Sequence, residues 1–306
     1  MQDISYLSTE QAAAYLHIKE RKLYDLVANG AVPCSKVTGK WLFPRAALDR
    51  WVAAGLTAPA GFAALAPPAI VGGSHDLLLE WTVRRSGAGL ALLSEGSEAG
   101  LTHLAGNEVM LAAVHLHDAD GADDANEAAI LADQGFHDVV LIAFARREQG
   151  LMLAAGNPLG IDGLGSAVRS GARIGLRQKG AGAQLLLESL MARQGLSIEQ
   201  HIGAATPADD RTRMDTTYPT GHDLALGIRA GEIDCGIATR SVALAHGLTF
   251  VPVVWEHFDL AMRRRSYFEP GPQALFALMR KPEFVRQATL LGGYDVSEAG
   301  RVRLNR

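Results

Sequence analysis

A glycine-rich turn in the first half of the sequence has the residues of an anion site. The apolar run Ala69-Ile70-Val71 stops at Gly72-Gly73-Ser74-His75-Asp76, and an amphipathic segment follows from Leu77 to Arg85. A strand that turns into a helix presents backbone N–H groups without helical partners, and two glycines let the main chain approach a bound group. Ser74 adds a hydroxyl, which suits either a ligand contact or the N-cap of the helix. His75 lies in the same turn and joins Ser74 as a candidate ligand residue.

Two other turns repeat this pattern and favour a ligand site. Ser94-Glu95-Gly96-Ser97 and Lys179-Gly180-Ala181-Gly182 each stand between a predicted strand and a predicted helix. Ser97 would offer a second hydroxyl, and the helix that opens at Gly182 would direct its positive end toward an anion. Lys179 would strengthen anion binding if it points inward, or its long stem would hold the charge in solvent.

Length and composition indicate a soluble protein with more than one domain. The chain has 306 residues, so two or three compact units are expected. A hydrophobic content of 48% with 20% charged residues is ordinary for a protein with a sizeable core. No apolar run reaches the roughly 18 to 20 residues that cross a bilayer. The first five residues also lack the pattern of a secretion signal, so we expect a cytoplasmic protein that does not contact a membrane.

The charge is unevenly divided along the chain. The net charge is −4, but residues 1–56 hold seven Lys or Arg against five Asp or Glu, which leaves an acidic remainder. This division indicates that only the first segment meets a polyanion. Cys34 and Cys235 lie far apart and do not have the spacing of a metal site, so we expect reduced structural thiols and no metal.

The first 54 residues have the pattern of a small helical domain. Ser8 and Thr9 open a short Ala-rich helix, and a second helix, from Lys19 to Ala28, ends at Asn29-Gly30. A hairpin follows with its turn at residues 38–40, and Pro44 is expected to begin a third helix. Two short helices joined by a tight turn form a helix-turn-helix.

Three motifs in this segment are typical of one family. They are the Leu-Ser-Thr-Glu-Gln-Ala-Ala start, the Ala-Val-Pro after the second helix, and Lys40-Trp41-Leu42-Phe43-Pro44 before the third. Residues 6–53 thereby resemble the excisionase and MerR-like winged helix-turn-helix family. The resemblance implies that the second helix enters the major groove of double-stranded DNA and that the hairpin contacts phosphates. The DNA-binding residues it implies are Lys19, Arg21, Lys22, Tyr24, Lys36, Lys40 and Arg45. Each alone also fits a solvated surface residue, and Trp41 fits the core.

The rest of the chain predicts a linker and a larger α/β domain. Residues 55–68 hold three prolines and no charged residue, so they predict a linker between residues 1–54 and 69–306. From Ala69 onward predicted strands alternate with predicted helices, which indicates α/β layers with a mainly parallel sheet. In such sheets ligands bind at the carboxyl ends of the strands.

Short motifs across residues 69–306 carry a second resemblance. They are Gly72-Gly73-Ser74-His75-Asp76, Gly96-Ser97 with Gly100-Leu101, Val114-His115-Leu116, Gly150-Leu151 with residues 156–161, Arg177-Gln178 with residues 180–182, residues 230–236, and Gly292-Gly293-Tyr294. The segment resembles the type II periplasmic-binding-protein fold, and more narrowly the molybdate-binding-like domain fused behind a helix-turn-helix in bacterial one-component regulators. This resemblance implies lobe I at about 69–145 and 256–306 and lobe II at about 146–255, joined by crossing strands and closing on a small ligand. It implies molybdate or tungstate, although the same donors would accept sulfate, a carboxylate or a phosphorylated metabolite.

Four further residues are candidates for the ligand site. His115 ends an apolar strand and is either a structural histidine or a ligand contact. Arg177 ends another strand and would contact the ligand or form an ion pair between the lobes. Thr220 opens a helix, as a cap or a ligand contact, and His222 follows it.

The sequence thus predicts an α/β protein with an N-terminal winged helix-turn-helix followed by a two-lobed type II periplasmic-binding-protein-like domain. Its predicted function is a ligand-responsive DNA-binding transcription regulator that senses a small anion and acts as a homo-oligomer, a dimer or a tetramer. The alternatives are a regulator that senses an organic acid or other metabolite, a molybdenum-cofactor-related binding protein or enzyme, and the binding component of a transporter. Neither a nucleophile with an adjacent base nor a metal triad is apparent, so we expect no catalytic residue and no cofactor.

Overall fold

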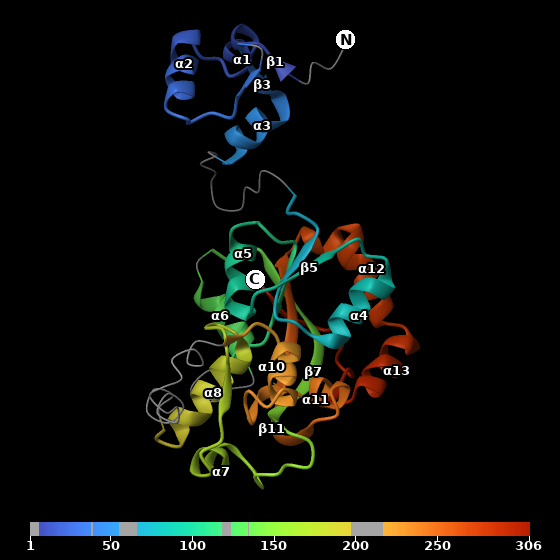
Figure 1. The fold of residues 1–306 in the computed structure, drawn as a ribbon. Helices are drawn as coiled ribbons and strands as arrows, with labels where there is room; N and C mark the ends of the chain where they lie inside the picture. The colour runs from blue at the N-terminus through green and yellow to red at the C-terminus, as the bar shows by residue number, and fades with distance from the viewer. Residues whose placement is uncertain (1–5, 38, 55–65, 118–123, 134, 197–216) are drawn as a thin grey trace, which may run out of the picture. The chain divides into compact units, whose positions relative to one another are not determined.

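The computed structural model of the protein describes residues 6–37, 39–54, 66–117, 124–133, 135–196 and 217–306. The chain divides into two compact units, residues 1–65 and 66–306 (Figure 1). The predicted linker falls mostly on residues 55–65, which lie outside the described residues, as does Thr38 in the predicted hairpin turn.

The first unit is a helix-turn-helix with a small sheet. Its elements are β1 (Tyr6–Leu7), α1 (Thr9–Tyr15), α2 (Glu20–Ala28), β2 (Ser35–Val37), β3 (Lys40–Pro44) and α3 (Arg45–Ala54). A capping box starts α1, since Ser8 Oγ accepts from Gln11 N and Gln11 Oε1 accepts from Ser8 N. The strands pair antiparallel in the order β1-β3-β2. The predicted helix-turn-helix, hairpin and third helix are confirmed, but Pro44 pairs with Tyr6 at the end of β3 and does not belong to α3.

A small apolar core holds the first unit together. Its buried residues are Leu7, Ala12, Ala13, Leu23, Val32, Phe43 and Leu48. Trp41 packs against this core, as predicted. The exposed residues of α2 therefore lie on the side of the helix that faces away from this core.

The second unit is an α/β domain with a mixed sheet. Its strands are β4 (Ile70–Gly73), β5 (Ala91–Ser94), β6 (Leu111–Val114), β7 (Val139–Leu153), β8 (Ile174–Arg177), β9 (Thr217–Tyr218), β10 (Cys235–Thr239), β11 (Thr249–Arg263), β12 (Tyr294–Asp295) and β13 (Val302–Asn305). Its helices are α4 (Leu77–Ser86), α5 (Ser97–Ala105), α6 (Ala125–Ala132), α7 (Leu164–Arg169), α8 (Gly182–Arg193), α10 (Gly221–Arg229), α11 (Arg240–Ala245), the 3-10 helix η2 (Ser266–Phe268), α12 (Pro270–Met279) and α13 (Pro282–Leu291).

The strand directions correct the expectation of a mainly parallel sheet. The order is β5-β4-β6-β11-β7-β10-β8-β9, and β12 and β13 also pair with β7. Pairs at both ends of this order are parallel, but β11 is antiparallel to β6 and β7, and β7 is antiparallel to β10. The reason is that β7 and β11 are each 15 residues long and run through the whole unit in opposite directions. Local alternation of strands and helices carries no signal for such crossing strands.

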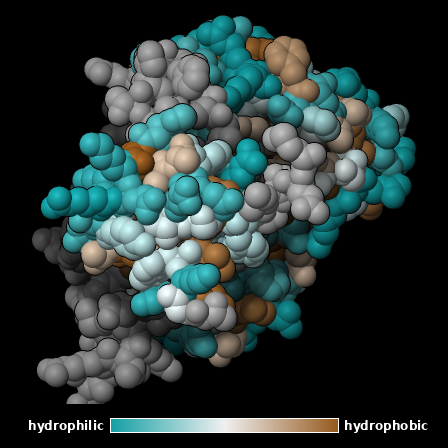
Figure 2. All heavy atoms as spheres, turned by 90° about the horizontal axis from the view of Figure 1, so that it is seen from above, coloured by the Kyte–Doolittle hydropathy of each residue, from teal (hydrophilic) through white to brown (hydrophobic). Residues whose placement is uncertain are grey.

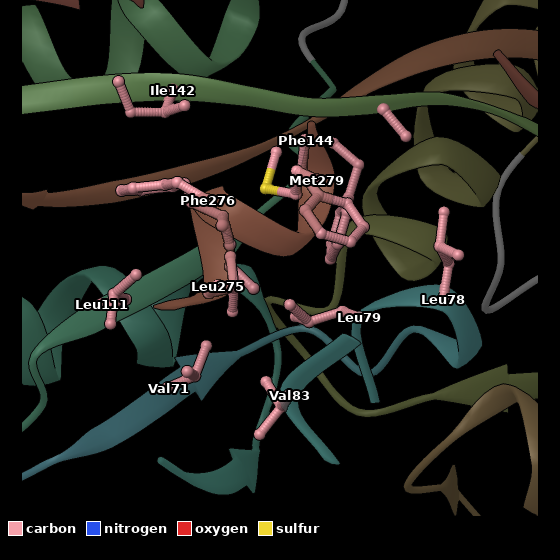
Figure 3. Packing of buried hydrophobic residues seen from close by; sticks show 14 of the residues in the cluster. Val71, Leu78, Leu79, Val83, Leu111, Ile142, Phe144, Leu275, Phe276 and Met279 are labelled. Carbon is pink, nitrogen blue, oxygen red and sulfur yellow. The ribbon is translucent and has the colours of Figure 1, made fainter. Parts of the chain in front are cut away.

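The crossing strands β7 and β11 join two lobes with separate cores (Figure 1). Lobe I is the half with β4, β5 and β6 and the helices α4, α5, α6, α12 and α13. One of its cores packs α4 and α12 against the sheet through residues such as Val71, Leu79, Phe144, Leu275 and Phe276 (Figure 3), and the other lies under α5 and α6. Lobe II is the half with β8, β9 and β10, and its cores lie under α7 and α8 and under α10 and α11.

The surface and the thiols are those of an ordinary globular domain. Hydrophilic residues cover most of the face drawn in Figure 2, and its hydrophobic residues form small separate groups. None of the helices in the described ranges is long and apolar enough to cross a membrane. Cys235 is buried, and burial raises the pKa of its thiol to about 12, which fits a structural thiol.

Truncation of Leu23 should destabilise the first unit. Leu23 is fully buried between the helices of this unit, so Leu23→Ala is expected to lower its free energy of unfolding by about 2–5 kcal/mol. Urea denaturation followed by tryptophan fluorescence measures this change. Val52→Ala is the matched control, because Val52 is exposed and its truncation should change stability by less than about 0.5 kcal/mol. Equal effects of the two changes would contradict the packing described here.

Candidate functional site

A cavity lies between the two lobes and against the crossing strand β7. Its empty volume, counted out to its mouth, is about 480 Å³. Lobe I contributes Ser74, His75 and His115, lobe II contributes Arg177 and Thr239, and β7 contributes Arg147 and Gln149. The cavity therefore brings together side chains that lie more than 150 residues apart in the sequence.

Several helices begin at this cavity. The N-cap residues Asp76 of α4, Gly96 of α5, Ala181 of α8 and Thr239 of α11 line it. The residues on either side of Thr220, which caps α10, line it as well. Each helix start carries partial positive charge and N–H groups without helical partners, so their convergence favours an anion.

Arg147 is buried between two carboxylates. It is 1% exposed, and it donates from Nε to Glu256 Oε1 (2.5 Å) and from Nη1 to Asp76 Oδ2 (2.9 Å). Its guanidinium also lies over the ring of Phe258, 4.1 Å from the centroid. Asp76 caps α4 by accepting from Leu79 N, while Glu256 lies on β11. One side chain thus ties a helix of lobe I to both crossing strands.

Two further side chains complete the surroundings of Glu256. Gln149 Nε2 donates to Oε1 (3.1 Å), and His117 Nε2 contacts Oε2 (2.6 Å). Burial raises the pKa of the Glu256 carboxyl, but the attraction of Arg147 and the hydrogen bond with His117 help to hold this pKa well below its usual range. Glu256 is therefore an ionised acceptor.

Arg177 is the cation that faces the cavity without a carboxylate. It donates from Nε to Tyr218 O (2.8 Å) and from Nη2 to Pro219 O (2.7 Å). Burial, and then repulsion from Arg147, lowers the pKa of Arg177 to about 10, while the charge of Asp223 opposes this. Among the residues that the structure describes, no ion pair involves Arg177. A guanidinium so placed remains charged at neutral pH and attracts an anionic group.

Ser74, Ser97 and His115 form a buried hydrogen-bonded group in lobe I. Ser97 Oγ donates to His115 O (2.9 Å), accepts from His115 N (3.0 Å) and lies 2.8 Å from Ser74 Oγ. Ser97 is fully buried and does not line the cavity, so it positions Ser74 and His115. Burial, and then the charge of Arg147, lowers the pKa of His115 well below its ordinary value, so this imidazole is neutral. Its Nε2 has no hydrogen-bond partner among the described residues.

The lobes touch each other beside the cavity at a position that only glycine fits. A Cβ on Gly182 would lie 2.1 Å from His115 O and 2.3 Å from His115 Nε2. Glu98 N donates to Gly180 O across the same contact (3.4 Å). Gly182 therefore permits the close approach of the lobes and does not itself line the cavity.

The predicted ligand residues divide into two groups. Ser74, His75, His115 and Arg177 line the cavity together. The residues that do not line it are Ser97, Lys179, Gly182, Thr220 and His222. The alternative in which Ser74 is the N-cap of α4 is wrong, because the N-cap is Asp76. His75 also lies 3.4 Å from Glu80 through its Nε2.

Three members of the second group, Lys179, Thr220 and His222, lie elsewhere in lobe II. Lys179 is exposed, which corresponds to the alternative in which its charge stays in solvent. Thr220 is the N-cap of α10, where its hydroxyl accepts from Asp223 N. His222 Nδ1 lies 2.8 Å from His246 Nε2 on the surface. In the described part of the chain, no group of three or more His, Cys, Asp or Glu side chains is arranged for a metal ion.

The sequence motifs miss three polar residues of the cavity. Arg147 and Gln149 lie in the middle of β7, and Thr239 ends β10. The polar run Arg146-Arg147-Glu148-Gln149 between two apolar stretches is the signal that would have pointed to the first two. No local sequence pattern distinguishes Thr239 as a cavity residue, since many threonines stand at the end of a strand.

The predicted DNA-binding residues form an exposed set in the first unit. Lys19, Arg21, Lys22 and Tyr24 lie on or beside α2 and are exposed, as are Lys36 and Lys40 on the hairpin and Arg45. Lys36 Nζ lies over the ring of Trp41 (5.2 Å), and Arg45 lies over the ring of Tyr15 (5.3 Å). The exposed basic side chains therefore lie on and beside α2, on the hairpin and at the start of α3.

Comparison with known proteins gives the class of each unit. Residues 80–280 match the family model described as PBP superfamily domain, and residues 6–55 match the one described as Helix-turn-helix domain. The chain belongs to the PBP superfamily and carries an excisionase-like helix-turn-helix in front of that domain, as the resemblances implied. This combination is that of a ligand-responsive DNA-binding regulator, and it points away from an enzyme.

Individual relatives cover most of the chain. The uncharacterized protein YvgK of Bacillus subtilis (strain 168) is 22% identical over 321 residues, which span 99% of each chain. A mutant of OxyR from Corynebacterium glutamicum is 14% identical, with 93% of this chain and 88% of that chain covered and a TM-score of 0.48. The sulfate-binding protein SubI from Mycobacterium tuberculosis is 13% identical, with 74% and 84% covered and a TM-score of 0.47.

Removal of the Arg147 charge should be strongly destabilising. Arg147→Met leaves Asp76 and Glu256 buried with one cationic partner fewer, so the free energy of unfolding should fall by about 3–5 kcal/mol. Urea denaturation measures this loss. The matched control is Arg84→Met, because Arg84 pairs with Glu80 on the surface (3.1 Å) and should contribute about 1 kcal/mol or less. A loss at Arg147 no larger than that at Arg84 would contradict the role of the network.

Proposed function

We propose that the protein is a transcription regulator that senses a small anion in the cavity between its lobes. The observation that carries the proposal is Arg177, a half-buried cation that lines the cavity and whose guanidinium donates only to the backbone carbonyls of Tyr218 and Pro219 among the described residues. The starts of α5 and α8, at Gly96 and Ala181, add positive potential without adding a side-chain acceptor. A ligand that neutralises Arg177 would offset the cost of partly burying a charge that has no ion-pair partner among the described residues.

The resemblance to molybdate-binding-like domains makes molybdate and tungstate the first oxyanions to consider. An organic acid or another anionic metabolite is the alternative. Both fit a guanidinium and helix starts, because both present negatively charged oxygen atoms. Their common feature is the anionic group that Arg177 would hold.

The first unit would read an operator through its second helix. The exposed cations on and around α2 would contact phosphates and base edges in double-stranded DNA, and the hairpin would contact the backbone. A domain of this size holds a single half-site weakly, so the active form would be a homo-oligomer, a dimer or a tetramer, bound in the cytoplasm to a two-part operator.

A ligand changes DNA binding only if it favours one arrangement of the protein over another. Arg177 belongs to lobe II, whereas Ser74 and His115 belong to lobe I, so a ligand that contacts both sides favours the arrangement in which the lobes touch. That preference is the free energy available for regulation.

Replacement of Arg177 should abolish anion-dependent stabilisation. In a thermal unfolding screen against molybdate, tungstate, sulfate, phosphate and small carboxylates, at least one anion at about 100 times its Kd should raise the Tm of the native protein by about 5–10 °C. Arg177→Gln should lose this shift because it removes the cation that faces the ligand. The matched control is Lys179→Gln, which removes an exposed cation two residues away and should keep the shift.

The unliganded Tm of each variant checks that it folds. Retention of the full shift in Arg177→Gln would remove the basis of the anion site. An equal loss in both variants would mean that general charge, and not the position of Arg177, causes the stabilisation.

Replacement of Lys22 should weaken DNA binding at all sequences. If Lys22 contacts a phosphate, Lys22→Ala lowers affinity and reduces the slope of log K against log salt by about 1. Fluorescence anisotropy with a promoter fragment at several salt concentrations measures both. Arg286→Ala removes an exposed cation of the second unit and is the control that should leave affinity and slope unchanged. An unchanged slope in Lys22→Ala would place Lys22 away from the phosphates.

A further inference from the structure

We infer that the anion recognised in this cavity also carries a hydrogen-bond donor, such as a hydroxyl, an ammonium group or an acidic proton; this inference rests on the proposed function. Three cavity side chains present lone pairs to the ligand, and the surrounding hydrogen bonds fix this orientation. They are Gln149, Thr239 and Ser74.

Gln149 presents its amide oxygen. It is 2% exposed, and its Nε2 donates to Glu256 Oε1 (3.1 Å). Because the ionised Glu256 only accepts, the amide nitrogen must face it, and the amide oxygen must face the other way. Gln149 Oε1 is buried and has no hydrogen-bond partner among the described residues. A ligand group that pairs with this oxygen has to be a donor.

Thr239 is the first member of a chain of hydroxyls with one direction. At the far end, the hydroxyl of Tyr294 donates to Asp76 Oδ2 (2.9 Å). Burial, and then the charge of Asp76, raises the pKa of Tyr294 well above its ordinary value, so Tyr294 keeps this proton. Ser241 Oγ, 3.1 Å away, must then donate to Tyr294 Oη, and Thr239 Oγ1, 2.9 Å from Ser241 Oγ, must donate to Ser241. The hydroxyl of Thr239, which lines the cavity, therefore has no proton left for a ligand and can only accept a hydrogen bond.

Ser74 has the same limitation in lobe I. The single proton of Ser97 goes to His115 O, which can only accept, so the proton of Ser74 goes to Ser97 Oγ. The backbone N–H of Ser74 is also used, since it donates to Ala113 O (2.9 Å). The expectation that Ser74 and Ser97 donate hydroxyl protons to the ligand is therefore not met in this arrangement.

The cavity thus offers some groups that suit negative charge and others that suit a hydrogen-bond donor. Arg177 and the helix starts suit an anionic group, whereas Gln149, Thr239 and Ser74 suit donors. Molybdate, tungstate and sulfate carry no proton at neutral pH, so they would place lone pairs against lone pairs. A hydroxycarboxylate, an amino acid or hydrogen phosphate satisfies both sides, and the shared chemistry is an anion with a donor next to it.

Matched pairs of anions test this inference on the full-length protein. Isothermal titration calorimetry should compare glycolate with acetate, lactate with propionate, and phosphate with sulfate at neutral pH. In each pair that binds, the anion with the donor should bind about tenfold tighter or more, because an unpaired buried acceptor is costly. A donor-free anion that binds as tightly as its partner overturns this inference and leaves the proposed function intact.

Thr239→Val tests the origin of the preference. Valine keeps the shape of threonine and removes its lone pairs, so the variant should still bind the anion but should lose about fivefold or more of the preference within a pair. Thr102→Val is the matched control, since Thr102 is exposed on α5 and bonds only Glu98 O of its own helix in the described structure. The preference should be unchanged there, and equal preferences in both variants would overturn the assignment.

The two failures are distinguishable. If no anion of either kind binds the native protein, the proposed function fails and this inference fails with it. If anions bind and Arg177→Gln abolishes binding, but the donor-free anion of each pair binds as tightly as its partner or more tightly, only the inference about the donor fails. The Tm of each unliganded variant confirms that a loss of preference does not reflect unfolding.

Discussion

The second unit depends on the burial of one guanidinium, that of Arg147. Taking such a charge out of water costs several kcal/mol, and the cost is offset only when the partners are well placed. Asp76 and Glu256 supply that geometry from the start of α4 and from β11. Tyr294 then joins the network through Asp76 and reaches Ser241 in α11. The hydrogen bonds that hold the crossing strands together therefore also fix the side chains around the cavity in both lobes.

The same network explains why two arginines in one cavity have different roles. Arg147 has two carboxylates within hydrogen-bond distance, so its charge is matched inside the protein. Arg177 has backbone carbonyls, which accept its protons but do not neutralise its charge. Burial, and then repulsion from Arg147, lowers the pKa of Arg177, so an anion beside Arg177 would offset both effects. The charge that remains for a ligand is thus a consequence of where the carboxylates lie.

Local sequence patterns predicted the class of fold and part of the site. The turn that contains Ser74 and His75, and the strand ends at His115 and Arg177, were found because each stands at a junction that periodicity and glycine mark. Arg147 was missed because its partners lie 71 and 109 residues away, and only the register of β7 against β11 brings them together. The direction of β7 and β11 was missed for the same reason, since strand pairing across lobes leaves no trace in local alternation.

Two of the residues that were predicted as contacts but do not line the cavity, Ser97 and Gly182, lie where the lobes approach each other. The hydroxyl of Ser97 makes hydrogen bonds to the backbone of His115. Gly182 has no side chain, which leaves room for the same histidine. Both residues therefore act on His115 from opposite lobes. This contact is made by backbone and a neutral imidazole, so it offers no charge pair that would hold the lobes together. Under the proposed function, a ligand that joins Arg177 to the side chains of lobe I would supply that attraction.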